Sequence, residues 1–269
     1  MKKIILIILG IGFLSYLGLY IYFYSIQDDR FKSVKLAKYH KFKFEEKFEE
    51  LTFNTKDGGE LNSLLFKAEN SRGVVCFWKG NGGNLQNWGQ IASQFLKYNL
   101  DIIITDYREH GKSKGAITIS NFYSDSQIIY DFLKTKYPEN QILIVGYSLG
   151  TNIASHLAAD NKPAMTVLID PKEKFADKFL QACFFSFFNI TRFPFRTDLD
   201  ITKISTPLII ITGTKSDLYS DAIKLKKLLN EKDKFIEIPG ADHRTILGHK
   251  ETDKTFSLYL QNSLSKSLH

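Results

Sequence analysis

Six short apolar runs, separated by segments with helical spacing, constrain this chain more than any other feature. The runs show little polar–apolar alternation, which is typical of strands buried on both faces; they cover residues 74–78, 101–105, 141–145, 165–169, 208–212 and 235–238. Apolar residues recur with helical spacing over 88–98, 122–137, 149–159, 218–231 and 245–260. This alternation predicts an α/β fold with a mostly parallel central sheet, covered by helices on both faces.

Two further extended stretches, 50–55 and 60–68, precede the first of these runs. The turn signal Lys-Asp-Gly-Gly joins them and predicts an antiparallel hairpin. We therefore expect one domain over residues 50–269. Residues 171–205 interrupt it with a connection far longer than the usual 2–6 residues, which predicts a functional insertion.

Composition excludes several classes of protein. An apolar fraction of 43% in 269 residues is enough for a well-buried core, and this excludes a disordered chain. The net charge of +7 is spread along the chain, whereas a nucleic-acid interface would concentrate it. The two cysteines, Cys76 and Cys183, belong to no zinc or iron–sulfur spacing. We expect no metal, no cofactor and no nucleic-acid partner.

The N-terminus has the composition of a membrane anchor. Residues 4–24 carry no charge, and 21 residues in a helix are long enough to cross a hydrocarbon core of about 30 Å. The stretch ends in aromatic residues suited to the headgroup region. We therefore predict an anchor over residues 1–26, which contacts the membrane through 4–24, followed by a charged linker over 27–49.

A cleaved signal peptide is the alternative for this stretch, because Lys2 and Lys3 form a positive start. The length of the apolar stretch and the lack of a small-residue cleavage site favour an uncleaved anchor. Basic residues flank the stretch on both sides, so the membrane face of the domain stays open.

The pattern Gly-x-Ser-x-Gly occurs twice, around Ser113 and around Ser148. A nucleophilic serine of this kind needs a strand that runs into a tight turn and then a helix, which exposes the hydroxyl at the edge of the sheet. Only Ser148 has that context, since an apolar run precedes it and a helical segment follows. Ser113 leads into Ala-Ile-Thr-Ile, which is no helix start, and we read it as a loop residue.

A serine nucleophile needs a general base. His243 lies in Pro-Gly-Ala-Asp-His-Arg, between the last predicted strand and the last helix, at the edge where ligands bind in open α/β sheets. We predict His243 as the base. His110, in the loop after a strand, could neighbour the site; the remaining histidines are interpreted as surface or satisfied polar positions, namely His40, His156, His249 and His269.

The base needs a carboxylate that orients it. We predict Asp217, because it follows the run 208–212 and precedes His243 by one helix and one strand. Asp170 and Asp221 remain alternatives. Asp242 adjoins His243 and is poorly placed to reach its ring.

Backbone N–H groups are expected to form an oxyanion hole beside the serine. Leu149, directly after Ser148, supplies one candidate. The glycine-rich loop Lys79-Gly-Asn-Gly-Gly-Asn84 follows the first parallel strand, and the N–H of Asn81 is the second candidate. A plain glycine turn is the alternative for this loop.

Taken together, five motifs resemble the α/β-hydrolase superfamily over about residues 50–265. They are Trp-Lys-Gly-Asn-Gly-Gly-Asn, Asp-Tyr-Arg-Glu-His-Gly-Lys-Ser, Gly-Tyr-Ser-Leu-Gly, Gly-Thr-Lys-Ser-Asp and Gly-Ala-Asp-His. Within it, the chain is most similar to Bem46-like serine hydrolases, which often carry an N-terminal membrane segment. It departs from their pattern twice: Lys79 stands where that group has histidine, and Ser216 stands where it has the acid.

In that architecture, the insertion at 171–205 forms a cap over the site. Eight phenylalanines lie between Phe175 and Phe195, and they either line an apolar acyl pocket or fill the cap's own core. We therefore predict a membrane-anchored serine hydrolase that cleaves ester or thioester bonds through an acyl-enzyme and favours apolar acyl groups. The alternatives are a serine peptidase of the same fold and a non-catalytic, membrane-bound binding module.

Overall fold

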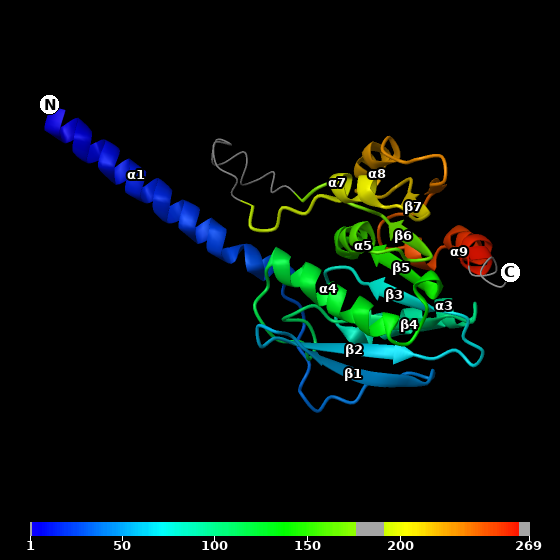
Figure 1. The fold of residues 1–269 in the computed structure, drawn as a ribbon. Helices are drawn as coiled ribbons and strands as arrows, with labels where there is room; N and C mark the ends of the chain where they lie inside the picture. Colours follow the sequence, from blue (N-terminus) through cyan, green and yellow to red (C-terminus); the bar gives the residue numbers. More distant parts are fainter. Residues whose placement is uncertain (1, 176–190, 264–269) are drawn as a thin grey trace.

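A single eight-stranded sheet runs through the computed structural model, which describes residues 2–175 and 191–263 (Figure 1). Its strands are β1 (Phe48–Asn54), β2 (Glu60–Phe66), β3 (Val74–Trp78), β4 (Asp101–Thr105), β5 (Ile142–Tyr147), β6 (Met165–Ile169), β7 (Leu208–Gly213) and β8 (Lys234–Ile238). Their order is β1-β2-β4-β3-β5-β6-β7-β8. β2 pairs antiparallel with β1 and β4, and all pairs from β4 to β8 are parallel. The predicted hairpin and mostly parallel sheet are confirmed.

Helices cover both faces of this sheet, as the sequence predicts. Within the domain they are α2 (Leu85–Trp88), α3 (Ala92–Leu96), α4 (Ile119–Lys134), α5 (Leu149–Asp160), α7 (Thr197–Asp200), α8 (Tyr219–Lys226) and α9 (Lys250–Ser263), with short 3-10 turns η2 (Gly89–Ile91), η3 (Glu139–Gln141), η4 (Ile201–Lys203) and η5 (Ile246–Gly248). Alternate residues of β3 lie on opposite faces of the sheet and pack with different helices. Cys76 and Trp78 pack in one core with α4, α5 and α8, while Val75 and Phe77 pack in the other with α3 and α9.

The parallel strands all end at one edge of the sheet. In the paired register, Tyr147 at the end of β5 lies opposite Ile169 at the end of β6, and Ile169 lies opposite Ile211 of β7. The loops that follow β5, β6, β7 and β8 therefore meet at this edge, where open α/β sheets bind their ligands.

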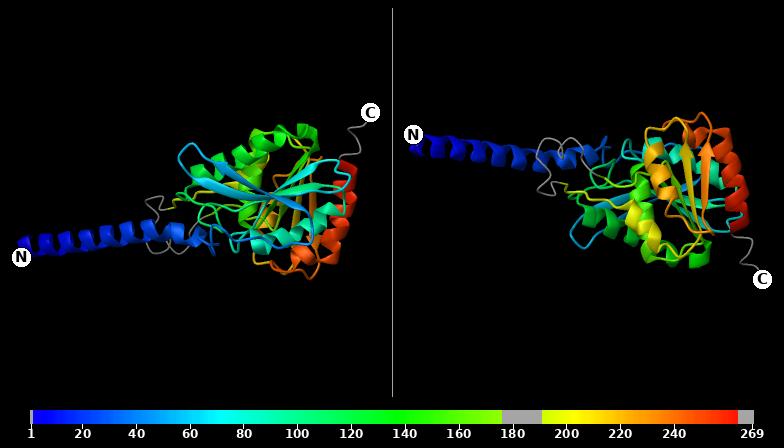
Figure 2. Two further views of the ribbon diagram at one scale, coloured as in Figure 1. Left: turned by 90° about the horizontal axis from the view of Figure 1, so that it is seen from below. Right: turned by 90° about the horizontal axis from the view of Figure 1, so that it is seen from above.

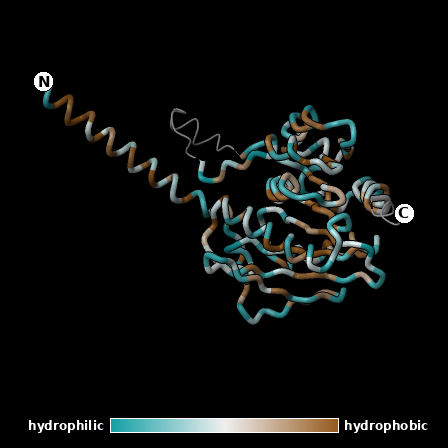
Figure 3. The backbone as a smooth tube through the Cα atoms, viewed as in Figure 1, coloured by the Kyte–Doolittle hydropathy of each residue, from teal (hydrophilic) through white to brown (hydrophobic). Residues whose placement is uncertain are grey.

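The N-terminal helix α1 (Lys2–Ser25) projects away from the domain in all views (Figures 1 and 2). It is apolar along its length (Figure 3), and its large side chains from Ile4 to Leu14 are exposed. It is the one helix in the described part of the chain that is long and apolar enough to cross a membrane. A signal sequence has the same length and composition.

The region after α1, which is predicted as a charged linker, is partly packed against the domain. α1 continues into the 3-10 turn η1 (Ile26–Phe31), and Gln27, Phe31 and Phe42 are buried against the domain. The physical reason is that phenylalanines occur among its charged residues, and burial of their rings stabilises packing. The expected boundary at residue 50 therefore leaves out a segment that packs as part of the domain.

Part of the predicted cap, 176–190, lies outside the described residues. Of the rest, Phe193 and Phe195 are fully buried and pack with Phe31 and Phe122 in one hydrophobic core. Ring centroids of Phe31 and Phe193 are 4.3 Å apart. These two rings of the insertion thus belong to the main hydrophobic core of the domain, and not to a core of the cap's own.

Close packing of α5 against the strand ends positions the residue between them. A Cβ on Gly150 would lie 1.9 Å from the carbonyl oxygen of Trp78, and a Cβ on Gly146 would lie 2.5 Å from the carbonyl oxygen of Gly150. Only glycine fits at these two positions. The turn between β5 and α5 is therefore fixed by backbone contacts that any side chain would break.

We expect Gly150→Ala to destabilise the fold by about 3 kcal/mol or more, because the added methyl group meets backbone atoms that have no room to relax. Gly248→Ala is the matched control, since a Cβ there meets nothing within 4 Å. Thermal unfolding followed by circular dichroism measures both. Equal melting temperatures for the two variants would contradict this account of the turn.

Candidate active site

Ser148 stands at the tip of β5 in a strained backbone conformation. Its φ is 53° and its ψ is −118°, in a region that residues other than glycine rarely adopt. Its N–H donates to the carbonyl of Ile169 at 3.0 Å. This turn presents the half-buried hydroxyl at the edge of the sheet, as the Gly-x-Ser-x-Gly context predicts.

His243 approaches that hydroxyl from the loop after β8. Its Nε2 lies 3.0 Å from Ser148 Oγ. The ring stacks on Tyr147, with centroids 5.1 Å apart, and the Tyr147 hydroxyl donates to the backbone carbonyl of His243. Asp242 accepts from the backbone N–H groups of Arg244 and Thr245, so its carboxylate shapes the loop. The sequence analysis did not predict a role for Tyr147. Its position directly before Ser148 was the only feature of the sequence that pointed to it.

The carboxylate beside His243 belongs to Asp170, directly after β6. Asp170 Oδ2 lies 2.8 Å from His243 Nδ1 and accepts from Ser216 Oγ at 2.7 Å. Its Oδ1 accepts from Thr212 Oγ1 at 2.8 Å and from the Gly213 N–H at 3.2 Å. Burial alone would raise the pKa of Asp170, but these hydrogen bonds outweigh it and hold the pKa below its usual range. Asp170 is therefore an ionised carboxylate that faces His243.

The prediction that Asp217 is the carboxylate beside His243 needs correction. Asp217 is exposed, lines the mouth of the cavity and makes no hydrogen bond with His243. Its neighbour Ser216 is the buried residue of this turn, and its hydroxyl is the group that points at Asp170. Because Ser216 occupies the inward position, Asp217 lies one residue too late in the chain to reach the imidazole. Asp221, the other alternative, forms an ion pair with Lys224.

The sequence held a signal for this arrangement. Ser216 stands where the Bem46-like pattern has its acid, which indicates that the carboxylate comes from elsewhere. Asp170 directly follows a strand that pairs with both β5 and β7. It also has a positive φ of 51°, like Ser148, and this conformation is visible only in the structure.

The glycine-rich loop after β3 places Asn81 at the cavity. Asn81 lines the cavity together with Ser148 and Leu149. Leu149 is the first residue of α5, and the first N–H groups of an α-helix have no acceptor within it. Hydrogen bonds from three side chains hold the loop: Tyr107 Oη donates to Lys79 O at 2.6 Å, Trp88 Nε1 to Gly82 O at 2.7 Å and Ser33 Oγ to Gly83 O at 3.0 Å.

Lys79 is the first residue of this loop, and its side chain lies beneath the loop in the protein interior. Its side chain is fully buried, with Nζ 2.8 Å from His110 Nδ1 and 3.3 Å from Asp106 Oδ1. Burial lowers the pKa of Lys79 to about 8, against the opposing effect of Asp106. Burial and the lysine charge together lower the pKa of His110 to about 3, so this imidazole is neutral. The side chains of Lys79 and His110 lie beneath the loop, and neither residue lines the cavity.

The other described histidines have local partners away from Ser148. His40 Nε2 lies 3.1 Å from Gln86 Oε1, His156 stacks on Tyr123, and His249 accepts from the Glu251 N–H. His269 lies outside the described residues. Within residues 2–175 and 191–263, no cluster of His, Cys, Asp and Glu is suited to hold a metal ion.

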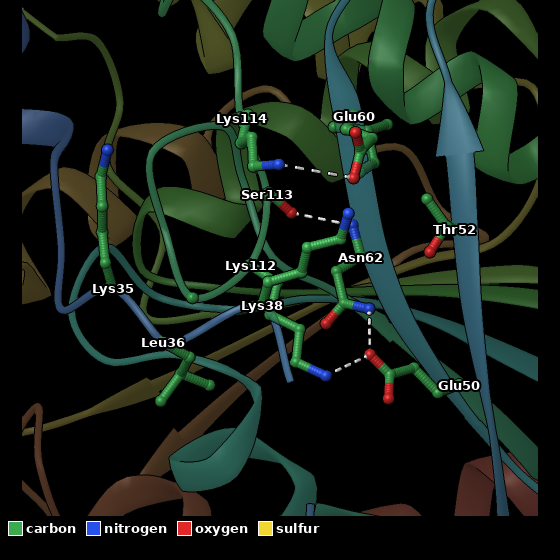
Figure 4. A pocket seen from close by; sticks show the side chains of 12 residues that line it. Lys35, Leu36, Lys38, Glu50, Thr52, Glu60, Asn62, Lys112, Ser113 and Lys114 are labelled. Atoms are coloured by element: carbon green, nitrogen blue, oxygen red, sulfur yellow. Dashed lines mark hydrogen bonds and ion pairs between the residues drawn. The ribbon is translucent and has the colours of Figure 1, made fainter. Parts of the chain in front are cut away.

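Ser113, in the second Gly-x-Ser-x-Gly, is a structural residue. It is buried, donates to the carbonyl of Asp106 at 2.8 Å and accepts from the Asn62 N–H at 2.8 Å. Figure 4 shows it in a separate pocket, beside Asn62 and among lysine and glutamate side chains. Three of these lysines form ion pairs, Lys35 with Glu109, Lys112 with Glu50 and Lys114 with Glu60.

A cavity of about 200 Å³ opens onto Ser148 and His243. Four apolar side chains contribute to its wall, from Phe31, Leu149, Phe175 and Leu218. The polar part of the wall consists of Asn81, Asn152, Lys172 and Asp217. The serine thus faces a small space of mixed polarity.

Comparison with known proteins agrees with this fold. The family model of the alpha/beta hydrolase fold matches residues 73–257. Human alpha/beta hydrolase domain-containing protein 17B is 29% identical over 207 residues, which cover 71% of this chain and 68% of that protein. The 17C protein of Xenopus tropicalis is 26% identical over 230 residues, covering 80% and 70% respectively.

Solved structures show the same fold at lower identity. An esterase of Pyrococcus furiosus superposes with a TM-score of 0.65 at 18% identity, over 88% of this chain and 99% of that one. A carboxylesterase structure from Nitrososphaera gargenis gives a TM-score of 0.65 at 15% identity, over 81% and 100%. The family model spans well over half of the chain and ends within α9, and the predicted superfamily is confirmed: the chain belongs to the α/β-hydrolase family.

Proposed function

We propose that this protein is a serine hydrolase that cleaves carboxylic ester or thioester bonds through an acyl-enzyme. The observation that carries the proposal is the continuous chain of contacts from Ser148 Oγ to His243 Nε2 and from His243 Nδ1 to Asp170 Oδ2. Membership of a hydrolase family supports the reaction class. The finer choice of an ester or thioester bond is our inference.

In the proposed reaction, His243 removes the proton of Ser148 as its oxygen attacks the acyl carbon. Asp170 keeps the imidazole in the tautomer that carries its proton on Nδ1, and its negative charge stabilises the imidazolium that forms. His243 then gives the proton to the departing alcohol or thiol. Water repeats the sequence on the acyl-enzyme, which frees the acid and restores Ser148.

The tetrahedral intermediates carry a negative oxygen, and we propose that the backbone N–H groups of Asn81 and Leu149 stabilise it. The unpaired N–H groups at the start of α5 and their partial positive charge support the role of Leu149. The hydrogen bonds that hold the glycine-rich loop support the role of Asn81, because a donor fixed in advance needs no reorganisation during reaction.

We propose further that α1 anchors the enzyme in a membrane. Its exposed apolar side chains from Ile4 to Leu14 support an anchor, because the hydrocarbon core of a membrane would give them an apolar environment. The cavity wall of Phe31, Phe175 and Leu218 supports a preference for apolar acyl groups. Which face of the membrane carries the domain is left open.

The alternative from another class is a non-catalytic binding module, which Lys79 by the oxyanion loop and the shifted acid Asp217 would support. Two observations weigh against it: the Lys79 side chain is buried, and the Asp170 carboxylate lies 2.8 Å from His243 Nδ1. No contact in the described residues favours a peptide over an ester, so a peptidase is not proposed.

The two Gly-x-Ser-x-Gly serines provide the first test. We expect a fluorophosphonate probe to label the full chain in detergent, and Ser148→Ala to lose all labelling, because the hydroxyl that reacts is gone. Ser113→Ala is the matched control: we expect it to lose about 1–3 kcal/mol of stability but to keep the label. A folded wild type that does not label, or a label that moves with Ser113, would contradict the proposal.

The two aspartates provide the second test. We expect Asp170→Asn to lower kcat for ester hydrolysis by about 10⁴-fold, because the amide favours the wrong imidazole tautomer. Asp217→Asn should stay within about threefold of wild type, since its carboxylate is exposed and outside the hydrogen-bond chain. Steady-state kinetics with a p-nitrophenyl ester measure both. A larger loss in Asp217→Asn than in Asp170→Asn would return the acid role to Asp217.

Acyl preference provides the third test. We expect kcat/KM for p-nitrophenyl octanoate to exceed that for the acetate by about tenfold or more, because each buried methylene adds about 0.8 kcal/mol of binding. Competition between the two esters, read by product release, measures the ratio. Equal turnover of the two esters would contradict the proposed preference for apolar acyl groups, but it would not contradict the proposed hydrolase activity.

A further inference from the structure

The segment between α1 and β1 is built into the catalytic domain. Gln27 and Phe31 are buried, with 4% and 2% of their surfaces exposed. The backbone of the segment then pairs with the loop after β4: the Gly111 N–H donates to Val34 O at 3.1 Å, and the Leu36 N–H donates to Gly111 O at 2.9 Å. In a flexible tether, these backbone N–H and C=O groups would form hydrogen bonds with water instead.

The same segment contacts the glycine-rich loop at three points. Asn81 Nδ2 donates to the carbonyl of Arg30 at 2.6 Å, Ser33 Oγ donates to the carbonyl of Gly83, and Asn84 Nδ2 donates to the carbonyl of Val34. Nε2 of the neutral His110 donates to the Phe31 carbonyl beneath the loop. The main chain that follows α1 is thereby fixed against the loop that holds the proposed oxyanion donor.

The side chain of Phe31 forms part of the cavity wall, on the same cavity as Ser148 and His243. The ring also contacts the aromatic core behind it, with centroid distances of 4.3 Å to Phe193 and 5.7 Å to Phe122. The ring therefore separates the cavity from a region filled by other phenylalanines. Loss of the ring would add apolar space next to the reacting serine.

We propose that Phe31 is a specificity-determining residue that limits the length of the acyl group the enzyme accepts. The proposal rests on the hydrolase function above, because it concerns the acyl side of the same site. The residue comes from the segment that leads directly out of the apolar helix, so the membrane-proximal chain contributes to the pocket itself. A shorter side chain here should let a longer acyl group enter.

The test compares acyl-length profiles of the full chain in detergent, with p-nitrophenyl esters from butyrate to decanoate. We expect Phe31→Ala to raise the ratio of kcat/KM for decanoate over butyrate by about tenfold relative to wild type, within the range that pocket methylenes give. Phe31→Leu should shift the ratio in the same direction by less. If Phe31→Ala does not fold, the comparison of Phe31→Leu with wild type provides the test.

Phe195→Ala is the matched control. Phe195 is equally buried and belongs to the same aromatic core, with its centroid 6.1 Å from that of Phe31, but it does not line the cavity. We expect it to lose stability and to keep the wild-type ratio within about twofold. A uniform fall in kcat/KM for all esters in both Phe31 variants, or an equal shift in Phe195→Ala, would overturn the proposal.

Failure of the proposed function has a different signature. In that case wild type would show no hydrolysis that depends on Ser148 with any ester, and the inference would fall with it. Hydrolysis that depends on Ser148, with a length profile unchanged in Phe31→Ala and Phe31→Leu, would overturn the inference alone.

Discussion

The contact between the first turn of α5 and the end of β3 determines where the rest of the site can lie. Gly150 brings the helix backbone against the carbonyl of Trp78, closer than any side chain would allow. The chain must then turn within one residue, and Ser148 takes the strained conformation that this turn requires. The cost of that strain, about 1–3 kcal/mol for such a residue, is offset by the pairing of β5 with β3 and β6, which fixes the strand end of the turn.

Asp170 shows how a buried charge can be held without a cationic side chain as its fixed partner. Each carboxylate oxygen accepts two hydrogen bonds, and three of the four donors come from β7 or the turn after it. These neutral donors help to hold the pKa of Asp170 below its usual range, since three of the four hydrogen bonds to its carboxylate come from groups without charge. Ser216 thus has a role in the site, because it supplies one of these donors.

Local sequence was enough for the sheet because six of its strands are short apolar runs and a turn signal joins the other two. It was less successful at helix ends: the segment predicted over 88–98 divides into η2 and α3, and the one over 218–231 is helical only from Tyr219 to Lys226. Ser148 and His243 were identifiable as a pair that the fold brings together, since each follows a strand within a short loop. The acid was not, because Asp170 and Asp217 both follow neighbouring strands, and only the direction of the turn after β7 decides which one reaches the imidazole.

Residues 27–49 were read as a linker for a related reason. Composition reports the average polarity of a segment, whereas packing depends on single side chains that meet a complementary surface. Phe31 and Phe42 reach different cores, on opposite faces of the sheet, so the segment lies against the domain from one layer to the other. The apolar helix therefore leads into a segment that is packed against the domain at several points. The chain that directly follows α1 accepts a hydrogen bond from Asn81 and forms one wall of the cavity.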